Sequence, residues 1–235
     1  MIIELKGGQF ANVGAHLMVC ETLRRLGDAL PGVMFAMYPT PLADPVSRKR
    51  YAIKTLLPMR KGNIDLVPLA YHVPSPIRSM LGQLGWVTEP DVCGVVDLSG
   101  FVYGAQWGDY SMRRAAAEIK RFGKFKQPYV FLPQAFGPFE NTRGASEFGA
   151  ALSRAALIYA RDHRSKANLD ALMPAGAPSV SVMPDMTMAA SSDFALANRL
   201  SIDAKTAVVV PNSRVVSQGV ADESRYIQFL VASAE

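Results

Sequence analysis

The stretch YVFLPQAFGPF, residues 129–139, and the stretch LIYARDHRS, residues 157–165, decide the fold class. Each begins with an apolar, β-branched or aromatic run that is typical of a short buried strand and continues into polar residues. The segment between them predicts a helix over residues 147–156, with Ser146 as its N-cap. A strand, a helix and a second strand predict a parallel βαβ unit with its ligand site at the carboxyl edge of the sheet.

The same alternation extends along most of the chain. Apolar runs predict strands, and helical spacing predicts helices, one of which covers residues 15–26 and ends at Gly27. Residues 39–89 are rich in proline and predict a long connection with one or two helices, including residues 77–84. The fold class is therefore α/β, a Rossmann-like parallel sheet flanked by helices. The remaining predicted strands cover residues 2–5, 33–37, 92–98 and 180–183, and the remaining helices cover 112–122 and 165–173.

A domain boundary is predicted after residue 190. Residues 1–190 form an N-terminal Rossmann-like domain, residues 191–205 form a linker, and a helical connector that overlaps the linker is predicted over 186–203. An apolar strand, residues 206–212, and a helix, residues 221–234, then read as the first βα unit of a second domain. One such unit cannot bury a core alone, so we expect residues 206–235 to be an incomplete second domain.

Composition excludes several classes of protein. The chain has 235 residues, 49% of them hydrophobic, which suits a globular protein with a sizeable core. Its sequence lacks an apolar run of the roughly 18 residues that span a bilayer, and the N-terminus becomes polar too soon for a signal peptide. We therefore expect a cytoplasmic protein. Cys20 and Cys93 are expected to be unpaired thiols.

The formal net charge is +5, and two basic clusters account for much of it. Each is either a solvated face or a surface for anions, and apolar residues within the first also allow peripheral contact with the inner membrane face. No P-loop or GxGxxG motif and no metal-ligand spacing among the histidines is found, so no nucleic acid, cofactor or metal is predicted. The first cluster is Arg48, Lys49, Arg50, Lys54, Arg60 and Lys61; the second is Arg113, Arg114, Lys120, Arg121, Lys124 and Lys126.

Five short motifs follow one another in a fixed order. Together they resemble the polysaccharide pyruvyl transferase family over about residues 1–215. One feature departs from the family pattern: an acidic residue usually follows the Asn-x-Gly turn, and this chain has Ala15-His16 there, so no acid-base role is expected at that corner. The motifs are Asn12-Val13-Gly14, the strand and glycine loop Val95 to Gly104, the loop Gln134 to Pro138, Arg161-Asp162-His163-Arg164-Ser165, and Pro184-Asp185.

The resemblance implies an activity and an architecture. Family members move a pyruvyl group from phosphoenolpyruvate to two hydroxyls of a glycan or lipid-linked sugar, which forms a ketal. The fold implied is GT-B-like, with two facing Rossmann-like domains, of which the second is cut short here. The main catalytic histidine and a second arginine are expected beyond Glu235, so no catalytic residue is assigned and residues 1–235 are expected to lack turnover.

Arg161 is the predicted donor-binding residue. It occupies the arginine of the family's RD element, and a guanidinium can pair bidentately with the carboxylate or phosphate of the donor. The structural alternative is an Arg161–Asp162 pair that caps the next helix. His163 is either a group that titrates near neutral pH or a surface residue at that helix start.

Four residues are predicted to contact the substrate, and each has a structural alternative. Asn12 and Gly14 form a strand-to-helix turn that suits a sugar hydroxyl but is common in nonfunctional turns. Asp97 either holds a sugar hydroxyl or bonds loop amides, and Gln134 either reads substrate hydroxyls or bonds its own loop. Asp185 is expected to organise the connection between domains. Aromatic residues after the third strand are expected to stack on a sugar or to pack under the loop: Phe101, Tyr103, Trp107 and Tyr110.

Three functions fit these features. The leading one is pyruvyl transfer to a cell-surface polysaccharide or its precursor. The rivals are a GT-B glycosyltransferase that uses a nucleotide sugar and a non-catalytic glycan-binding fragment. The acceptor sugar, the linkage and the oligomeric state are not encoded in any motif that we find.

Overall fold

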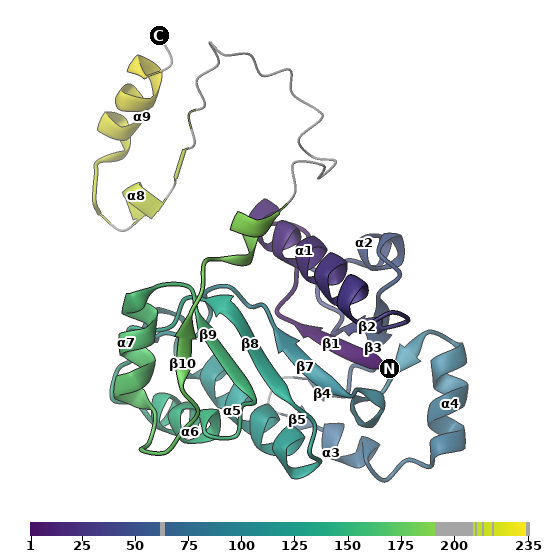
Figure 1. Ribbon diagram of the computed structural model, residues 1–235. Helices are drawn as coiled ribbons and strands as arrows, with labels where there is room; N and C mark the ends of the chain where they lie inside the picture. Colours follow the sequence, from purple (N-terminus) through teal and green to yellow (C-terminus); the bar gives the residue numbers. More distant parts are fainter. Residues whose placement is uncertain (62–63, 191–208, 210, 213, 218, 234–235) are drawn as a thin grey trace. The chain divides into compact units, whose positions relative to one another are not determined.

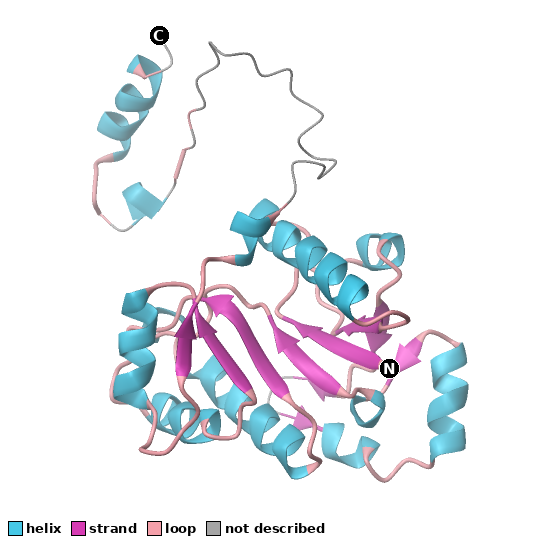
Figure 2. Cartoon of the chain, in the orientation of Figure 1, coloured by secondary structure: helices cyan, strands magenta, loops and turns pink. Residues whose placement is uncertain are grey.

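The structure is a computed structural model that describes residues 1–61, 64–190, 209, 211–212, 214–217 and 219–233. The chain divides into two compact units, Met1–Ala190 and Ser191–Glu235, and we describe each by itself. The first unit holds the sheet and most of the helices (Figure 1, Figure 2).

The first unit is built on a sheet whose strands, among the described residues, are all parallel. From β1 the chain adds strands in one direction, and it then crosses to β7 and adds strands in the other. The switch point therefore lies between β1 and β7, where Lys6 pairs with Asp97. The prediction of a parallel α/β sheet is confirmed. In sheet order the strands are β10 (Val180–Val182), β9 (Leu157–Ala160), β8 (Tyr129–Gln134), β7 (Gly94–Asp97), β1 (Ile2–Lys6), β2 (Met34–Met37), β3 (Lys54–Leu56) and β6 (Trp86–Val87).

Helices cover both faces of this sheet (Figure 2). One buried cluster joins the sheet to α1 through Met18 and Val19, and a second joins the sheet to α5 and α6 through residues such as Ile119 and Phe148. The helices of the first unit are α1 (Val13–Ala29), α2 (Pro45–Arg50), α3 (Val67–Ala70), α4 (Ser75–Gln83), α5 (Asp109–Lys124), α6 (Arg143–Leu152) and α7 (His163–Leu172), with short 3₁₀ turns η1 (Glu89–Asp91), η2 (Ala105–Trp107) and η3 (Met186–Ala189).

The central strand β1 shows how the sequence selects these two faces. Successive side chains of a strand point to opposite faces. Ile3 and Leu5 join the cluster of α1, whereas Lys6 reaches α5 on the other face. Glu4 shares that face with Lys6, so the strand buries apolar groups on one side and charged groups on the other.

Several predicted boundaries need correction. The helix predicted over 147–156 with a Ser146 cap is α6, and Thr142 caps it instead by accepting a hydrogen bond from the Ala145 amide at 3.2 Å. An earlier start lets the helix bury Ala145 and Phe148 together. Gly27 lies inside α1 rather than ending it, because the apolar face continues to Leu30.

The long connection predicted over residues 39–89 is wrong in part. It contributes β3 and β6 to the sheet, and it also forms an antiparallel pair, β4 (Arg60–Lys61) with β5 (Ile64–Asp65). These strands have two or three residues, too few to show a period of two in the sequence.

The second unit contains two described helices, α8 (Arg214–Ser217) and α9 (Glu223–Ala232), and Asp222 caps α9. The helix predicted over 221–234 is therefore confirmed with slightly shorter bounds. Of the predicted strand over 206–212, the described residues Val209, Pro211 and Asn212 are not in a strand, and the rest lies outside the described residues. The predicted connector begins as η3, and its part from 191 to 203 also lies outside them.

Candidate functional site at the carboxyl edge of the sheet

The predicted binding residues from four loops gather at one edge of the sheet. Asp97 ends β7 and Gln134 ends β8, while Asn12 follows β1 and Arg161 directly follows β9. These strands are neighbours and run in parallel, so the four residues follow the same ends of adjacent strands. This is the edge at which open α/β sheets bind ligands.

Asn12 and Gly14 form the start of α1. The Asn12 side chain is the N-cap and accepts a hydrogen bond from the Ala15 amide at 3.1 Å. His16, which with Ala15 follows this turn where the family resemblance leads one to expect an acid, lies 2.7 Å from the Tyr51 hydroxyl through its Nε2 atom. Burial and the nearby charge of Arg50 lower the pKa of His16, which favours a neutral imidazole at this corner.

Asp97 is fully buried and serves as an acceptor for its surroundings. The hydroxyls of Tyr103 and Tyr129 donate to one of its oxygens at 2.6 and 2.8 Å, and the Ser99 amide donates to the other at 3.0 Å. Lys6 completes the arrangement by donating to the Tyr129 hydroxyl at 2.8 Å. The loop-amide contact that the sequence offered as one alternative is thus present, and the sugar contact of Asp97 stays a prediction.

Gln134 is also fully buried, and its amide nitrogen lies 3.5 Å from Asp97. Its carbonyl oxygen has no hydrogen-bond partner among the described residues. An unpaired buried acceptor is costly and uncommon in folded proteins.

The loop after β8 and the start of α7 are joined by specific contacts. Asp162 caps α7 by accepting from the Ser165 amide at 2.7 Å, and the Ser165 hydroxyl in turn accepts from the Phe136 amide at 3.1 Å. Gly137 has a φ of +80°, and a Cβ there would lie 2.5 Å from the Asn168 side chain. The Q-x-x-GP loop and the RD-x-x-S element therefore form one unit that fixes the backbone next to Arg161.

The Arg161 guanidinium is partly exposed, and two carboxylates and an aromatic ring lie near it without making close hydrogen bonds to it. It lies 3.7 Å from the Asp162 carboxylate and 3.6 Å from that of Asp185, and 5.9 Å from the centre of the Phe101 ring. Both ion-pair distances exceed the length of a normal hydrogen bond. The N–H groups of Arg161 thus keep capacity for an anionic ligand.

Asp185 itself begins the turn η3, where its carboxylate accepts from the Thr187 amide and hydroxyl at 3.0 Å. Of the aromatic residues predicted to stack or pack, Tyr103 packs in the core, 1% exposed, between other rings. Phe101, Trp107 and Tyr110 lie at the surface, 36, 43 and 59% exposed, and the rings of Phe101 and Trp107 meet edge to face.

Sequence reasoning missed a buried network of charges beneath this edge. Glu118 of α5 pairs with Lys6, Arg60 and Arg114 and is almost fully buried. A second buried carboxylate, Glu89, pairs with Arg60 at 3.1 Å and with Arg121 at 2.8 Å. The signal in the sequence was the pair of charged residues, Glu4 and Lys6, on one face of an otherwise apolar strand.

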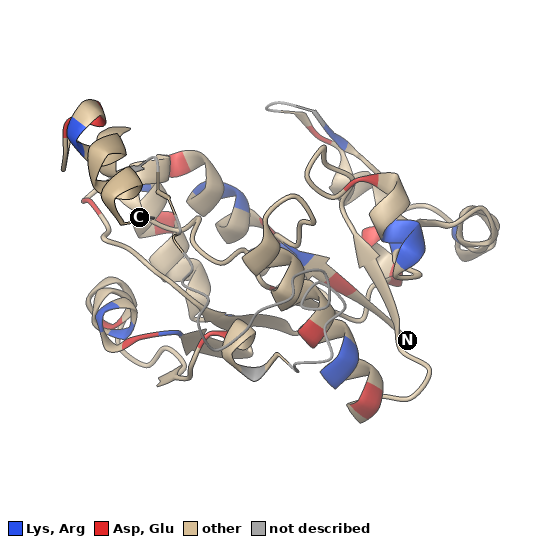
Figure 3. Cartoon of the chain, turned by 90° about the horizontal axis from the view of Figure 1, so that it is seen from above, with Lys and Arg blue, Asp and Glu red and all other residues tan. Residues whose placement is uncertain are grey.

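The network changes the interpretation of the two basic clusters. Arg60, from the first, and Arg114 and Arg121, from the second, point inward to Glu118 and Glu89. Acidic and basic segments are interspersed over the first unit (Figure 3). In the part of the chain that the structure describes, no group of three or more His, Cys, Asp or Glu side chains could hold a metal ion.

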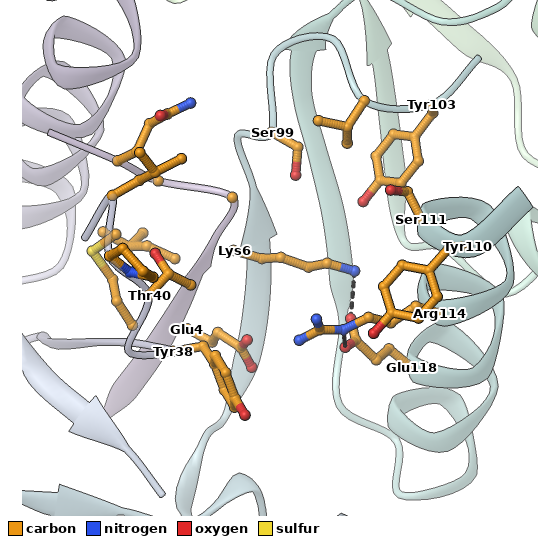
Figure 4. A pocket seen from close by; sticks show the side chains of 18 residues that line it. Glu4, Lys6, Tyr38, Thr40, Ser99, Tyr103, Tyr110, Ser111, Arg114 and Glu118 are labelled. Atoms are coloured by element: carbon orange, nitrogen blue, oxygen red, sulfur yellow. Dashed lines mark hydrogen bonds and ion pairs between the residues drawn. The ribbon is translucent and has the colours of Figure 1, made fainter. Parts of the chain in front are cut away.

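A cavity of about 520 Å³ opens at the switch point between β1 and β7, and Lys6, Arg114 and Glu118 lie along it (Figure 4). Its upper border is formed by the loops that follow β1 and β7. These loops touch closely at Gly7, which has a φ of +75° and where a Cβ would lie 2.5 Å from the Ser99 Cα atom. Only glycine therefore fits this corner without displacing the neighbouring loop.

Comparison with known families decides the identity. The profile of the family described as polysaccharide pyruvyl transferase matches residues 12–232. The chain belongs to the polysaccharide pyruvyl transferase family. The resemblance inferred from the five motifs is thereby confirmed, and membership implies a transferase related to polysaccharides. No curated protein matches the chain.

Within this transferase, the family match covers all four of the residues Asn12, Asp97, Gln134 and Arg161. No helix among the described residues is long and apolar enough to cross a membrane.

Proposed function

We propose that this family member transfers the pyruvyl group of phosphoenolpyruvate to two hydroxyls of a sugar in a cell-surface polysaccharide or its precursor. The observation that carries the proposal is the family match over residues 12–232. In the reaction, C2 of the donor forms two bonds to sugar oxygens, and its bond to the phosphate oxygen breaks. One hydroxyl proton is gained by the methylene carbon, which becomes a methyl group, and the other leaves with the phosphate.

Arg161 is the residue that we propose for the donor. The donor carries a carboxylate and a phosphate, and a planar guanidinium can make two parallel hydrogen bonds to either group. Its position after β9, with ion pairs longer than hydrogen bonds to Asp162 and Asp185, supports this role. In the two-domain arrangement implied by the family, Arg161 would reach the donor from the first domain.

Asn12, Gly14, Asp97 and Gln134 remain proposed substrate-side residues. Asn12 is exposed and could contact a hydroxyl directly. Asp97 and Gln134 are buried, so we propose that they act by holding the loop that starts at Leu98 in place. Peripheral contact with an anionic membrane is proposed only for the exposed cations of the first basic cluster, Lys49 and Arg50.

The proposal is tested by deleting the gene in its host and analysing the surface polysaccharide by NMR for pyruvate ketals. We expect the ketals to disappear, to return with the wild-type gene and to remain low with Arg161→Ala. The exposed Arg154, changed in the same way, is the matched control and should restore them.

Loss of a sugar residue instead of the ketal would favour the glycosyltransferase and refute the proposal. A polysaccharide that is unchanged by the deletion would refute both and favour a glycan-binding protein.

A further inference from the structure

The cavity lies at the switch point, where the strand order of the sheet reverses between β1 and β7. Its border includes Gly7 and Gly8 after β1 and Ser99 and Val102 after β7, and α5 closes its other side. A volume of about 520 Å³ is within the range of small-molecule sites, which occur preferentially at such switch points.

The charges along the cavity select the class of ligand. Its two cations, Lys6 and Arg114, are already paired with Glu118, and Lys6 also lies 3.9 Å from Asp97. A phosphate or carboxylate would have to displace these partners and approach the carboxyl groups of Glu4 and Glu118. The cavity therefore disfavours anions and suits a neutral, polar molecule.

Glu4 supplies an unusual group on the cavity wall. Its side chain projects from the middle of β1 into the space between the sheet and α5 (Figure 4), and the residue is only 8% exposed. From the part of the chain that the structure describes, no hydrogen bond or ion pair reaches its carboxyl group; neighbouring charges act on it at a distance. A buried carboxyl group of this kind gains free energy when a ligand provides hydrogen-bond partners.

The protonation state of Glu4 fits a hydroxyl-bearing ligand. Burial and the negative charges of Glu118 and Glu89 raise the pKa of Glu4 to about 8, although Lys6 and Arg60 oppose them. At neutral pH the carboxyl group thus carries a proton in most molecules. It can then both donate and accept a hydrogen bond, as a sugar hydroxyl also does.

The rest of the cavity wall has the features of a carbohydrate site. Tyr110, 59% exposed, presents a ring at its mouth, and the hydroxyls of Thr40, Ser99 and Ser111 lie around it (Figure 4). A second cavity, of about 20 Å³, also borders Glu4, and it has room for a single water molecule at most. The larger cavity is therefore the one that can hold a ligand.

We propose that this cavity binds a neutral sugar unit of the acceptor, with Glu4 hydrogen-bonded to its hydroxyls and Tyr110 against its ring. The identity of the ligand as an acceptor rests on the proposed function. The loop after β7 links this site to the donor side, because Ser99 and Val102 line the cavity while Phe101 packs beside Arg161.

Titration of the protein with neutral methyl glycosides of hexoses and N-acetylhexosamines, followed by saturation-transfer NMR and calorimetry, tests the proposal. We expect at least one glycoside to bind. Ser111→Trp, which fills the cavity from the surface of α5, should abolish binding. Glu4→Leu, which replaces the carboxyl group with an apolar side chain of similar size, should weaken binding roughly tenfold or more. Glu140→Leu, at an exposed glutamate outside the cavity, is the matched control and should bind as wild type.

Two results would overturn the assignment: no glycoside binds the wild-type protein, or binding is unchanged by Ser111→Trp. Phosphoenolpyruvate or inorganic phosphate that binds in a manner blocked by Ser111→Trp would also refute a neutral ligand. Sugar binding together with unchanged ketals in the deletion strain would refute the transfer reaction alone. Lost ketals without sugar binding would refute the cavity assignment alone.

Discussion

Replacing Glu118 with glutamine removes the carboxylate that joins the sheet to α5. Glu118 is 4% exposed and pairs with Lys6, Arg60 and Arg114. Glutamine has nearly the same shape, so the change removes charge with little loss of packing. Lys6, Arg60 and Arg114 would then lose the carboxylate that pairs with all three, and we expect the free energy of unfolding to fall.

The magnitude follows from the pKa of the carboxyl group. Burial opposes ionisation of Glu118, but the charges of Lys6, Arg60 and Arg114 outweigh it and lower the pKa from its ordinary 4.5 to about 2. At about 1.4 kcal/mol for each tenfold change in proton affinity, the ionised form stabilises the fold by about 3 kcal/mol. This agrees with the roughly 3–5 kcal/mol usually lost when one partner of a buried ion pair is removed.

The pH dependence has a definite sign. Because the pKa of Glu118 is lowered on folding, its contribution is complete above about pH 4.5 and is lost as the pH falls toward 2. The difference between wild type and Glu118→Gln should therefore be constant at neutral pH and shrink in acid.

Urea unfolding followed by tryptophan fluorescence measures this difference. Trp86 and Trp107 are the only tryptophans of the chain, and both lie in the first unit, so the signal reports on that unit. Glu147→Gln is the matched control, since Glu147 is 30% exposed and pairs with the exposed Arg143. We expect the control to lose less than about 1 kcal/mol. If Glu118→Gln loses no more than the control, the network does not stabilise the fold as we argue.

Three further changes test the geometry of the site by the same unfolding measurement. Gly7→Ala combines a positive φ of +75° with a clash against the loop after β7, and it should lower the free energy of unfolding by well over ~2 kcal/mol. Gly32→Ala, with a φ of +81° but open space around it, should lower it by only ~1 kcal/mol. Equal losses would refute the close contact at Gly7. Tyr129→Phe removes the hydroxyl that donates to Asp97 and should cost about 1–3 kcal/mol, and an unchanged midpoint would show that this buried hydrogen bond contributes nothing. Asp162→Ala removes the N-cap of α7 and should cost about 1 kcal/mol, which a variant as stable as wild type would contradict.

The parts of the fold that could be predicted are those whose signals are local. The runs that became β1, β7, β8 and β9 are apolar and are followed by polar loops, so both the strands and the shared edge of Asp97, Gln134 and Arg161 were accessible from sequence. The structural alternative for Asp162, a helix cap, was also visible because an N-cap depends on neighbouring residues.

What could not be predicted depends on contacts between distant residues. Lys6 and Glu118 form an ion pair across 112 positions, and no local pattern connects them. Asp97 likewise accepts a hydrogen bond from Tyr129, 32 positions further along the chain. The short strands β3 and β6 are held by their neighbours in the sheet rather than by a periodic sequence.

We propose that the carboxyl edge of the sheet holds an anionic pyruvyl donor through Arg161. The most direct test is calorimetric titration of phosphoenolpyruvate into the full-length protein as its host produces it. Loss of a charge-assisted contact costs about 1.5–3 kcal/mol, so Arg161→Ala should weaken binding roughly ten- to a hundredfold. Arg161→Lys should also weaken it, because an ammonium cannot reproduce the planar fork, while the exposed control Arg154→Ala should not. If both Arg161 variants bind phosphoenolpyruvate as tightly as wild type, Arg161 is only a structural partner of Asp162 and Asp185, and the claim is wrong.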